Sequence, residues 1–416
     1  MVDIHSHPTS EPGNKGLLEE LGSPRLGQSS LYEFMPVFRI PPDAAPFASR
    51  YAIAEMLRSG VTTYCDLSMA RDGWVEQIAA TGIRAVLAPM FKSAIWRTRD
   101  GHSVEYEWDE AGGYSGMKRA LEIIDEAERH PSGRLSGLVS PAQLDTCTRE
   151  LLRDAQTEAK RRKLPVQIHA AQSVVEFNEI TRRHGMTPIE FLDDVGLLDG
   201  DLIIAHCIFL NDHPWIHWPQ ARDFARLEAA KPSVAHCPNV FWRRGIALNY
   251  FRRYVEAGIT MGLGTDTFPH NFVDEMRTCA MAARLIAGDF TAASTHDIFN
   301  AATVGGAKAL GRDDIGRIAV GAKADLVLID TQHPLMHPLR EPLRSLIYTA
   351  SDRPIRDVYV GGEQVVRDGE VQTIDIREAA AKLSAAQEIT IAGVRQRDWA
   401  NRTIEDMSPM VFPVVQ

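Results

Sequence analysis

Short apolar runs alternate with longer segments of helical periodicity along most of the chain. Eight runs have the length of buried strands: Val2–His5, Val61–Asp66, Arg84–Pro89, Leu135–Val139, Val166–His169, Leu202–His206, Ser233–His236 and Ile259–Gly264. The segments between them predict helices over Phe47–Ser59, Asp72–Ala80, Gly116–His130, Thr148–Arg162, Thr187–Val195, Gln220–Ala229, Leu248–Ala257 and Val273–Ile286. This repetition of strand and helix favours a (β/α)8 barrel over an open doubly wound sheet.

The pattern changes after Gly305, where β-type segments follow one another without long helices. Residues 315–330 predict a turn and a buried strand, and residues 357–366 predict a hairpin around Gly361 and Gly362. A helix is expected near Ile376–Ile391. We therefore divide the chain into a barrel over residues 1–311, a small and incomplete β-sandwich domain over 312–371, and a C-terminal helix and tail over 372–416.

Composition narrows the class of protein. The 416 residues are 44% hydrophobic and 24% charged, which is ordinary for a globular domain. The net charge of −10 offers no basic surface, so nucleic acid is not an expected partner. No stretch approaches the roughly 18 apolar residues of a membrane helix, so no membrane partner is expected either. The five cysteines are widely spaced and form no CxxC, which predicts neither a disulfide framework nor a thiolate zinc cluster and favours a reducing cytoplasm.

Histidines gather at the ends of the predicted strands. His5 and His7 stand two residues apart, so in an extended strand their side chains point to the same side. Three more histidines end later strands and an aspartate follows the last one: His169, His206, His236 and Asp266. One such histidine alone is more often a buried residue bonded to the backbone. Five of them with a carboxylate, at the same face of a barrel, predict a catalytic metal centre.

These motifs resemble those of a known family. The order HxH, His at the fifth and sixth strands, HCP after the seventh and GTD after the eighth, followed by IGRIAVGAKADLVLID, resembles the amidohydrolase superfamily, in its branch of cytosine-deaminase-like and triazine hydrolases. The resemblance covers essentially the whole chain. It implies that His5, His7, His169 and Asp266 bind one divalent metal ion, zinc or iron with manganese as a further option. It also implies that His206 contacts the water or the substrate and that Asp266 accepts the water proton.

The reaction implied by this resemblance is the attack of metal-bound hydroxide on a carbon–nitrogen bond other than a peptide bond. The expected substrate is a small N-heterocyclic or amide-like molecule, and homodimers are common among similar proteins. The rival hypothesis is a degenerate barrel that binds a metal or ligand without turnover. Asp266 and His206 favour the hydrolase, because a pure binding protein would not need them.

Two segments depart from the family pattern. Deaminating relatives carry His-Leu-Ala-Glu at the fifth strand, where the Glu protonates a ring nitrogen, whereas this chain has His169-Ala-Ala-Gln172. The family's Pro-His-Ala-Pro-Tyr-Thr-Cys is here Pro141-Ala-Gln-Leu-Asp-Thr-Cys147, with Ala142 at the histidine position. A carboxamide can form hydrogen bonds but cannot donate and recover a proton near neutral pH. Deamination, amide hydrolysis and chloride displacement on a purine, pyrimidine or triazine therefore all stay open.

Other residues are candidates for substrate contact. Besides Gln172 and His236, they are Asn239, Trp242 and Arg243 after the seventh strand and His270 after Asp266. A solvated turn, or simple packing in the case of His270, is an equal alternative. The segment Lys92–Tyr114 predicts a long loop, either a lid or a structural insertion. Cys207 and Cys237 are expected to pack in the core, because neighbouring strand residues face opposite ways.

The chain starts directly before the first barrel strand. Similar proteins begin with a β segment that pairs with the C-terminal strands, so this chain either lacks that segment or has half of the small sandwich. If the sequence is complete, exposed strand edges are expected in residues 312–371, with a cost in stability or solubility.

Overall fold

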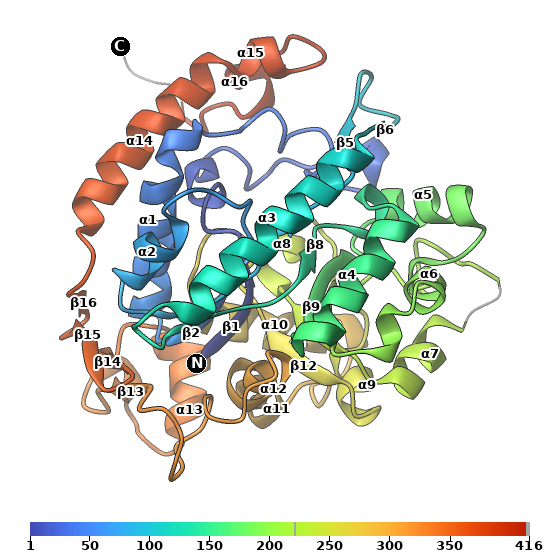
Figure 1. Cartoon of the computed structure of the whole chain (residues 1–416). Coiled ribbons are helices and arrows are strands. Elements are labelled where there is room, and N and C mark those ends of the chain that lie inside the picture. Colours follow the sequence, from blue (N-terminus) through green and yellow to red (C-terminus); the bar gives the residue numbers. More distant parts are fainter. Residues whose placement is uncertain (220–221, 413–416) are drawn as a thin grey trace.

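The computed structural model describes residues 1–219 and 222–412, and a closed barrel of parallel strands lies at its centre (Figure 1). The barrel strands are β1 (Val2–Ser6), β2 (Thr63–Asp66), β3 (Arg84–Leu87), β7 (Leu135–Gly137), β9 (Val166–Ala170), β10 (Leu202–His206), β11 (Ser233–His236) and β12 (Thr260–Leu263). They form two sheets in the orders β1-β2-β3-β7 and β12-β11-β10-β9. Parallel bridges Val139–Val166 and Ser6–Asp266 join the sheets at both seams. The predicted (β/α)8 barrel is confirmed.

Helices cover the outside of the barrel between successive strands (Figure 1). They are α1 (Ala45–Arg58), α2 (Trp74–Ala79), α3 (Glu110–Arg129), α4 (Arg149–Arg162), α5 (Val174–His184), α6 (Pro188–Asp194), α7 (Asp223–Ala230), α9 (Phe251–Glu256) and α10 (Phe272–Ala287). The short helix α8 (Pro238–Trp242) lies at the mouth of the barrel instead. α5 and α8 are not predicted from the sequence. Another helix is predicted over Gln220–Ala229, and its first two residues lie outside the described residues. Helix α7 begins at Asp223.

Helix α3 begins at Glu110 rather than at Gly116 as predicted. The reason is a cap, because the Asp109 carboxylate accepts a hydrogen bond from the backbone N–H of Gly112 at 2.8 Å. The three glycines of its first turns lower the helical signal of the sequence, yet the cap and the packing of the apolar face hold the helix.

The segment predicted as a long loop after the third strand is a hairpin. β4 (Met90–Phe91) pairs with β8 (Ser140–Pro141), and then β5 (Ala94–Arg97) and β6 (Glu105–Trp108) pair antiparallel. The Tyr106 hydroxyl donates to Asp145 Oδ2 at 2.7 Å. The Arg183 guanidinium lies over the rings of Tyr106 and Trp108, at 5.2 and 4.9 Å from their centroids. These contacts hold the hairpin against α5 as an ordered wall of the barrel mouth.

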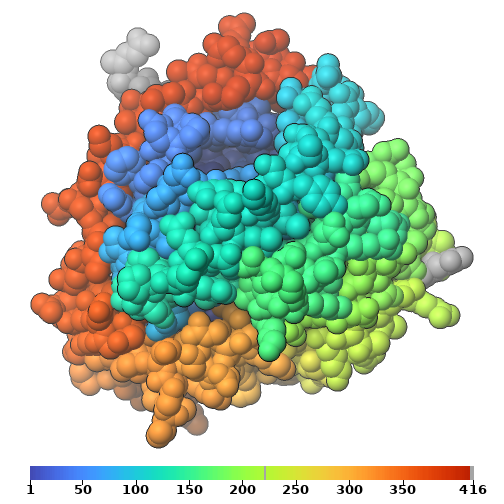
Figure 2. Space-filling view, viewed as in Figure 1, coloured from blue at the N-terminus to red at the C-terminus, as the bar shows by residue number. Residues whose placement is uncertain are grey.

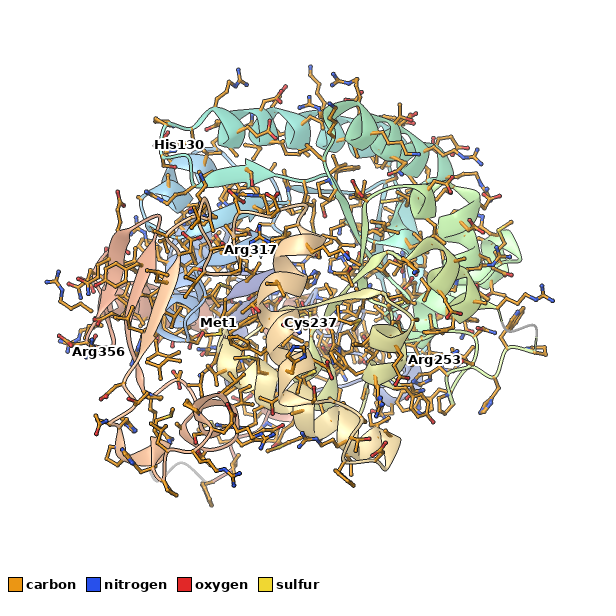
Figure 3. The ribbon with its side chains drawn as sticks, turned by 90° about the horizontal axis from the view of Figure 1, so that it is seen from below. Met1, His130, Cys237, Arg253, Arg317 and Arg356 are labelled. Atoms are coloured by element: carbon orange, nitrogen blue, oxygen red, sulfur yellow. The ribbon has the colours of Figure 1, made fainter. Side chains whose placement is uncertain are left out.

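The last strands form a small antiparallel sheet beside the barrel, with Arg356 on its outer side (Figure 3). Its order is β13 (Leu326–Ile329), β14 (Ile355–Val360), β15 (Glu363–Arg367) and β16 (Glu370–Val371). The predicted hairpin is confirmed, since Gly361 and Gly362 turn the chain with φ of 59° and 86°. The prediction that the first of these strands is buried is wrong. β13 is the edge strand, and its Leu328 is 36% exposed.

Further short helices lie around the barrel and the small sheet, and the predicted C-terminal helix is confirmed. These elements are α11 (Thr295–Asn300), α12 (Gly306–Ala309), α13 (Pro342–Ser345), α14 (Ile376–Ala392), α15 (Val394–Arg397) and α16 (Ile404–Met407). α14 packs against α1, as Figure 1 shows. Among the described residues, no helix combines the length and apolar character that a membrane span requires.

The C-terminal helices also hold the long segment that follows β1. The Glu33 carboxylate accepts from Trp399 Nε1 at 3.0 Å and from Arg402 Nη2 at 2.7 Å. Arg397 Nε donates to the backbone oxygen of Val37 at 2.7 Å. Apolar residues from both segments share one buried cluster, which includes Leu18, Phe34, Phe38, Val394 and Met407. The segment after β1 therefore has a fixed position although it contains no long helix.

A buried ion pair joins the small sheet to the barrel. Arg84, at the start of β3, binds Asp325 through two parallel contacts of 2.8 Å, and the two side chains are 2% and 3% exposed. The backbone N–H of Gly361 donates to the same carboxylate at 2.7 Å. The carboxylate of Asp325 thus has partners on both parts of the molecule.

We expect Arg84→Met to lower the free energy of unfolding by about 3–5 kcal/mol, because the buried Asp325 carboxylate loses its counter-charge. Urea denaturation followed by circular dichroism measures the change. In the double variant Arg84→Met/Asp325→Leu both charges are removed, so most of the lost stability should return. Equal stability of the parent and the single variant would contradict the role of the ion pair.

Candidate metal centre

Three histidine rings converge at the carboxyl end of the barrel. His5 belongs to β1, His7 follows that strand, and His169 belongs to β9. One ring nitrogen of each lies within 4.8 Å of the others, and the Nε2 atoms of His7 and His169 are 3.1 Å apart. Asp266 follows β12 and places Oδ1 at 3.7 Å from His5 Nε2 and at 3.4 Å from His7 Nε2. The two seams of the barrel thus bring residues far apart in sequence to one point.

Each ring is oriented by a hydrogen bond on its far side. His7 Nδ1 lies 2.7 Å from the backbone oxygen of Leu67, and His169 Nδ1 lies 2.5 Å from that of Ala142. His5 Nδ1 lies 2.5 Å from Gln167 Oε1, and the amide nitrogen of Gln167 donates to the Ile4 oxygen. Since a carbonyl oxygen only accepts, Nδ1 carries the proton in each ring. The Nε2 lone pairs of all three rings therefore point toward one another.

This arrangement fits a metal ion. Burial lowers the pKa of His7 to about 4 and that of His169 well below its ordinary value, so both rings are neutral. Two neutral Nε2 atoms then face each other with no proton between them, and Nε2 of His5 is buried with no hydrogen-bond partner among the described residues. A cation among these atoms would satisfy all three lone pairs, and backbone or amide oxygens on Nδ1 are the usual outer partners of metal-binding histidines.

Asp266 lies between this cluster and His206. Its Oδ2 is 3.7 Å from His206 Nε2. Burial acts to raise the pKa of Asp266, but the neighbouring imidazoles of His206, His5 and His7 hold it well below its usual value, so the side chain is a carboxylate. Burial lowers the pKa of His206 to about 3, which keeps that ring neutral. A carboxylate next to a neutral imidazole can take up and pass on a proton.

A cavity of about 560 Å³ opens above these side chains. His7, His169, His206 and Asp266 form its polar floor. The walls are mainly apolar and come from the segment after β1, the β5–β6 hairpin, helix α8 and the loop after β12, with Phe38, Ile40, Trp96, Phe241 and Phe268. In Figure 2 the surface is hollowed between the blue N-terminal segment and the teal hairpin. The volume is that of a small-molecule site.

The structure separates the six remaining candidate residues into three pairs. Gln172 and Arg243 line the cavity. His236 and Trp242 line a separate narrow space behind Phe241.

Two other candidates interact with neighbouring helices. The backbone N–H of Asn239 donates a hydrogen bond to the Glu275 carboxylate of α10. The side-chain oxygen of Asn239 accepts one from the Thr278 hydroxyl of the same helix. His270 is fully buried, with Nδ1 at 3.8 Å from a Glu55 oxygen of α1. Both side chains thus connect the loops at the barrel mouth to the helices outside it.

The two barrel cysteines behave differently from each other. The Cys237 thiol was expected to pack in the core, and it is buried near the middle of the molecule (Figure 3). Its sulfur nevertheless lies within 4.8 Å of ligand atoms of His5, His206 and Asp266. Burial raises the pKa of Cys237 well above its ordinary value, so it stays a thiol. Cys207 is buried in the main apolar cluster, as expected.

Lys92 and Gln143 line the cavity but are not among the candidates drawn from the sequence. A signal was available for Gln143, because it lies in the segment Pro141–Cys147 that departs from the family pattern. Lys92 begins the segment Lys92–Tyr114 that the sequence marks as a possible lid, but its place in the cavity depends on the pairing of β4 with β8 directly before it.

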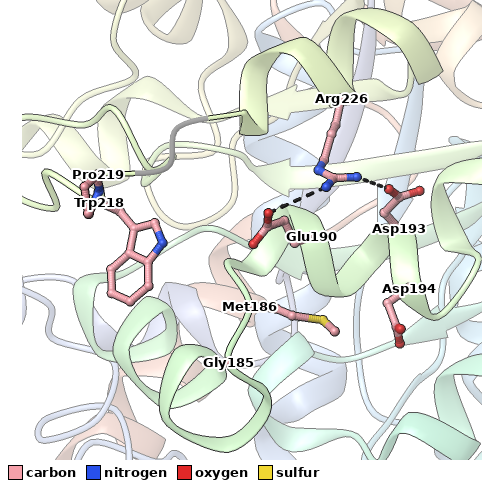
Figure 4. Close-up of a pocket in the computed structure, with 8 residues that line it drawn as sticks. All are labelled: Gly185, Met186, Glu190, Asp193, Asp194, Trp218, Pro219 and Arg226. Carbon is pink, nitrogen blue, oxygen red and sulfur yellow. Dashed lines mark hydrogen bonds and ion pairs between the residues drawn. The ribbon is translucent and has the colours of Figure 1, made fainter.

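A second hollow lies away from the histidines, beside α6 and α7 (Figure 4). Its charged groups largely neutralise one another, since Arg226 contacts Glu190 at 3.6 Å and Asp193 at 2.5 Å. The third carboxylate, Asp194, also lies in ion pairs, with Arg149 and Arg153, whereas the cavity at the barrel mouth has buried imidazoles on its floor.

Comparison with known proteins agrees with this geometry. Residues 1–365 match the amidohydrolase family. The chain is 31% identical to a 5-methylthioadenosine/S-adenosylhomocysteine deaminase of Natronomonas pharaonis, over 80% of this chain and 73% of that protein. It is 29% identical to a 5'-deoxyadenosine deaminase of Methanothermobacter thermautotrophicus, over 79% of this chain and 74% of that protein.

Two solved structures share the fold. One is a zinc-bound adenosine deaminase from Xanthomonas campestris, with a TM-score of 0.75, 24% identity and coverage of 94% of this chain and 84% of that one. The other is a zinc complex of atrazine chlorohydrolase from Arthrobacter aurescens, with a TM-score of 0.75, 21% identity and coverage of 93% and 87%.

We expect Gln167→Leu to weaken zinc binding by about 10- to 100-fold, because His5 loses the hydrogen bond that orients its ring. Zinc retained per chain, measured against increasing chelator, reports the change. Gln156→Leu is the matched control, since this buried glutamine bonds to Gly196 far from the histidines. An unchanged zinc affinity in Gln167→Leu would show that the amide has no part in ring orientation.

Proposed function

Because the chain belongs to the amidohydrolase family and is a hydrolase of non-peptide carbon–nitrogen bonds in N-heterocyclic substrates, we propose that it removes an amino group from a ring carbon of a purine nucleoside. The observation that carries this proposal is the polar floor, where three neutral imidazoles and one carboxylate meet beneath a mainly apolar cavity of about 560 Å³. An apolar cavity of this size suits a flat heterocycle, and the curated relatives are named as deaminases of adenosine derivatives.

His5, His7, His169 and Asp266 would hold one divalent metal ion. Zinc is the first choice, because nitrogen and carboxylate ligands suit it and two structures of the same fold contain it. When bound, such an ion supplies Lewis-acid activation of a water molecule.

The side chains of this protein would then handle the protons. As the water oxygen bonds to the ring carbon, Asp266 takes up a water proton and later gives it to the departing amine. His206 lies 3.7 Å from that carboxylate and orients it. The amide Nε2 of Gln172 is buried and has no partner among the described residues, so it can donate a hydrogen bond to the ring nitrogen where negative charge develops. Gln172 thus stabilises this charge without transferring a proton.

The test is a panel of adenosine, 5'-deoxyadenosine, methylthioadenosine and S-adenosylhomocysteine, incubated with zinc-loaded protein. Release of ammonia, and its loss on adding a chelator, are expected. Asp266→Asn, compared at equal zinc content, should lower kcat by about 100- to 10,000-fold while substrate binding persists, since the amide cannot accept the water proton. No ammonia from any of the four would overturn the proposal, and full activity of the Asn variant would overturn the role of Asp266.

Lys92 adds a preference among these substrates. It lines the cavity with its ammonium 5.1 Å from the Trp96 ring centroid, and it forms no ion pair with the described residues. Burial lowers its pKa, and the Arg39 guanidinium lowers it further. A cation in this position calls for an anionic group on the ligand. The carboxylate of S-adenosylhomocysteine could supply it, whereas methylthioadenosine has none.

Lys92→Met should therefore raise KM for S-adenosylhomocysteine by about 10- to 100-fold, the usual worth of a charged hydrogen bond. KM for methylthioadenosine should change little. Initial rates of ammonia release measure both values, with Lys118→Met on the outer helix α3 as control. Equal effects on the two substrates would argue against an anion site at Lys92.

A further inference from the structure

Two glutamine side chains that line the cavity each have one buried amide atom without a partner among the described residues. Gln143 follows β8 and Gln172 follows β9, and they are 8% and 6% exposed. Both line the cavity. Gln143 Oε1 and Gln172 Nε2 are buried and have no hydrogen-bond partner among the described residues. Buried polar atoms are nearly always satisfied, so one free acceptor and one free donor at the same floor call for a ligand.

The backbone places these two residues on either side of His169. Gln143 forms a parallel bridge with His169, and the His169 N–H donates to the Ala142 oxygen at 3.3 Å. Gln172 lies three positions beyond His169, in a turn where Ala171 has a φ of 54°. The Glu176 carboxylate holds this turn by accepting from the backbone N–H groups of Ala171 and Gln172, each at 2.8 Å. The backbone of both residues is therefore fixed beside His169.

A structural role would use these amides differently. Gln167 in β9 is equally buried, but its side-chain oxygen accepts a hydrogen bond from His5 Nδ1 and its side-chain nitrogen donates one to the Ile4 backbone oxygen. Gln156 in α4 donates to the Gly196 oxygen. Both of these glutamines join protein elements, whereas Gln143 and Gln172 line the cavity and each keeps one buried amide atom without a partner among the described residues. The contrast indicates that the second pair serves a ligand.

We propose that Gln143 selects an amine as the leaving group, by accepting a hydrogen bond from the exocyclic N–H of the substrate, while Gln172 donates to the adjacent ring nitrogen. An amino-substituted heterocycle presents this edge, a donor next to an acceptor. A ring carrying methoxy or chloride in place of the amine has no donor for Gln143 Oε1. Gln143 is thus a specificity-determining residue, and the inference rests on the proposed function.

The edge contacts also set the orientation of the ring. With both amides engaged, the carbon between the amine and the ring nitrogen lies toward the floor, where Asp266 and His206 are. Neither amide titrates near neutral pH, so this recognition is independent of pH. Gln143 and Gln172 both lie where the sequence departs from the family pattern. Together they would offer two neutral hydrogen bonds in place of the one acidic side chain that the family carries at the position of Gln172.

The test compares adenosine with 6-methoxypurine riboside, which differ only in the leaving group. In the parent, kcat/KM should favour adenosine. Gln143→Met should lower kcat/KM for adenosine by about 10- to 100-fold and leave the methoxy compound nearly unchanged. Gln143→Glu keeps an acceptor at the same place and should keep the preference for the amine. Gln156→Met, a buried glutamine remote from the cavity, is the matched control.

A binding measurement separates this inference from the proposed function. Calorimetric titration of the Asp266→Asn variant with both compounds should show tighter binding of adenosine, and adding Gln143→Met should remove that difference. If the protein releases ammonia but Gln143→Met changes both compounds equally, the proposed function stands and the inference fails. If no ammonia is released but the binding preference depends on Gln143, the inference on recognition stands and the proposed function fails. Binding of neither compound overturns the inference.

Discussion

The structure depends on holding the imidazoles of His5, His7 and His169 and the carboxylate of Asp266 together around one point. Such a cluster repels itself unless the rings are oriented from outside and a cation lies within. The outside orientation comes from two backbone oxygens and the Gln167 amide, all on the far side of the rings. Barrel closure completes it, because the Asp266 N–H donates to the His5 oxygen and the His7 N–H to the Asp266 oxygen, both at 2.8 Å.

The scaffold holds these side chains in place and forms the cavity walls from elements distant in sequence. The segment after β1 is held by the C-terminal helices through Glu33 and Arg402, and the β5–β6 hairpin is held by Tyr106 on Asp145. The small sheet is tied to the bottom of the barrel through Arg84. The walls of the cavity therefore depend on contacts made well outside the floor, whereas the floor is formed by residues at or just after the ends of the barrel strands.

The departures from the family pattern have a common physical meaning. At the end of β9 a carboxylic acid would bring a titrating group into the cavity, and Gln172 brings a neutral donor instead. After β8 a histidine is replaced by Ala142, and the next residue, Gln143, supplies a neutral acceptor. In the proposed reaction the substrate edge is therefore recognised by hydrogen bonds, and the protons are handled by Asp266, whose pKa the neighbouring imidazoles hold below its usual value.

The sequence by itself determined the barrel, its eight strands in order, and the strand ends that carry His5, His7, His169, His206 and Asp266. Strand periodicity is local, and residues at the carboxyl ends of parallel strands must meet at one face. Only the tertiary structure decided which other side chains reach the cavity. Trp242 and His236 lie behind Phe241, and Lys92 enters through a hairpin that local pattern does not reveal. These placements depend on packing against α10 and α5, which are distant in sequence, so a short stretch of sequence cannot reveal them.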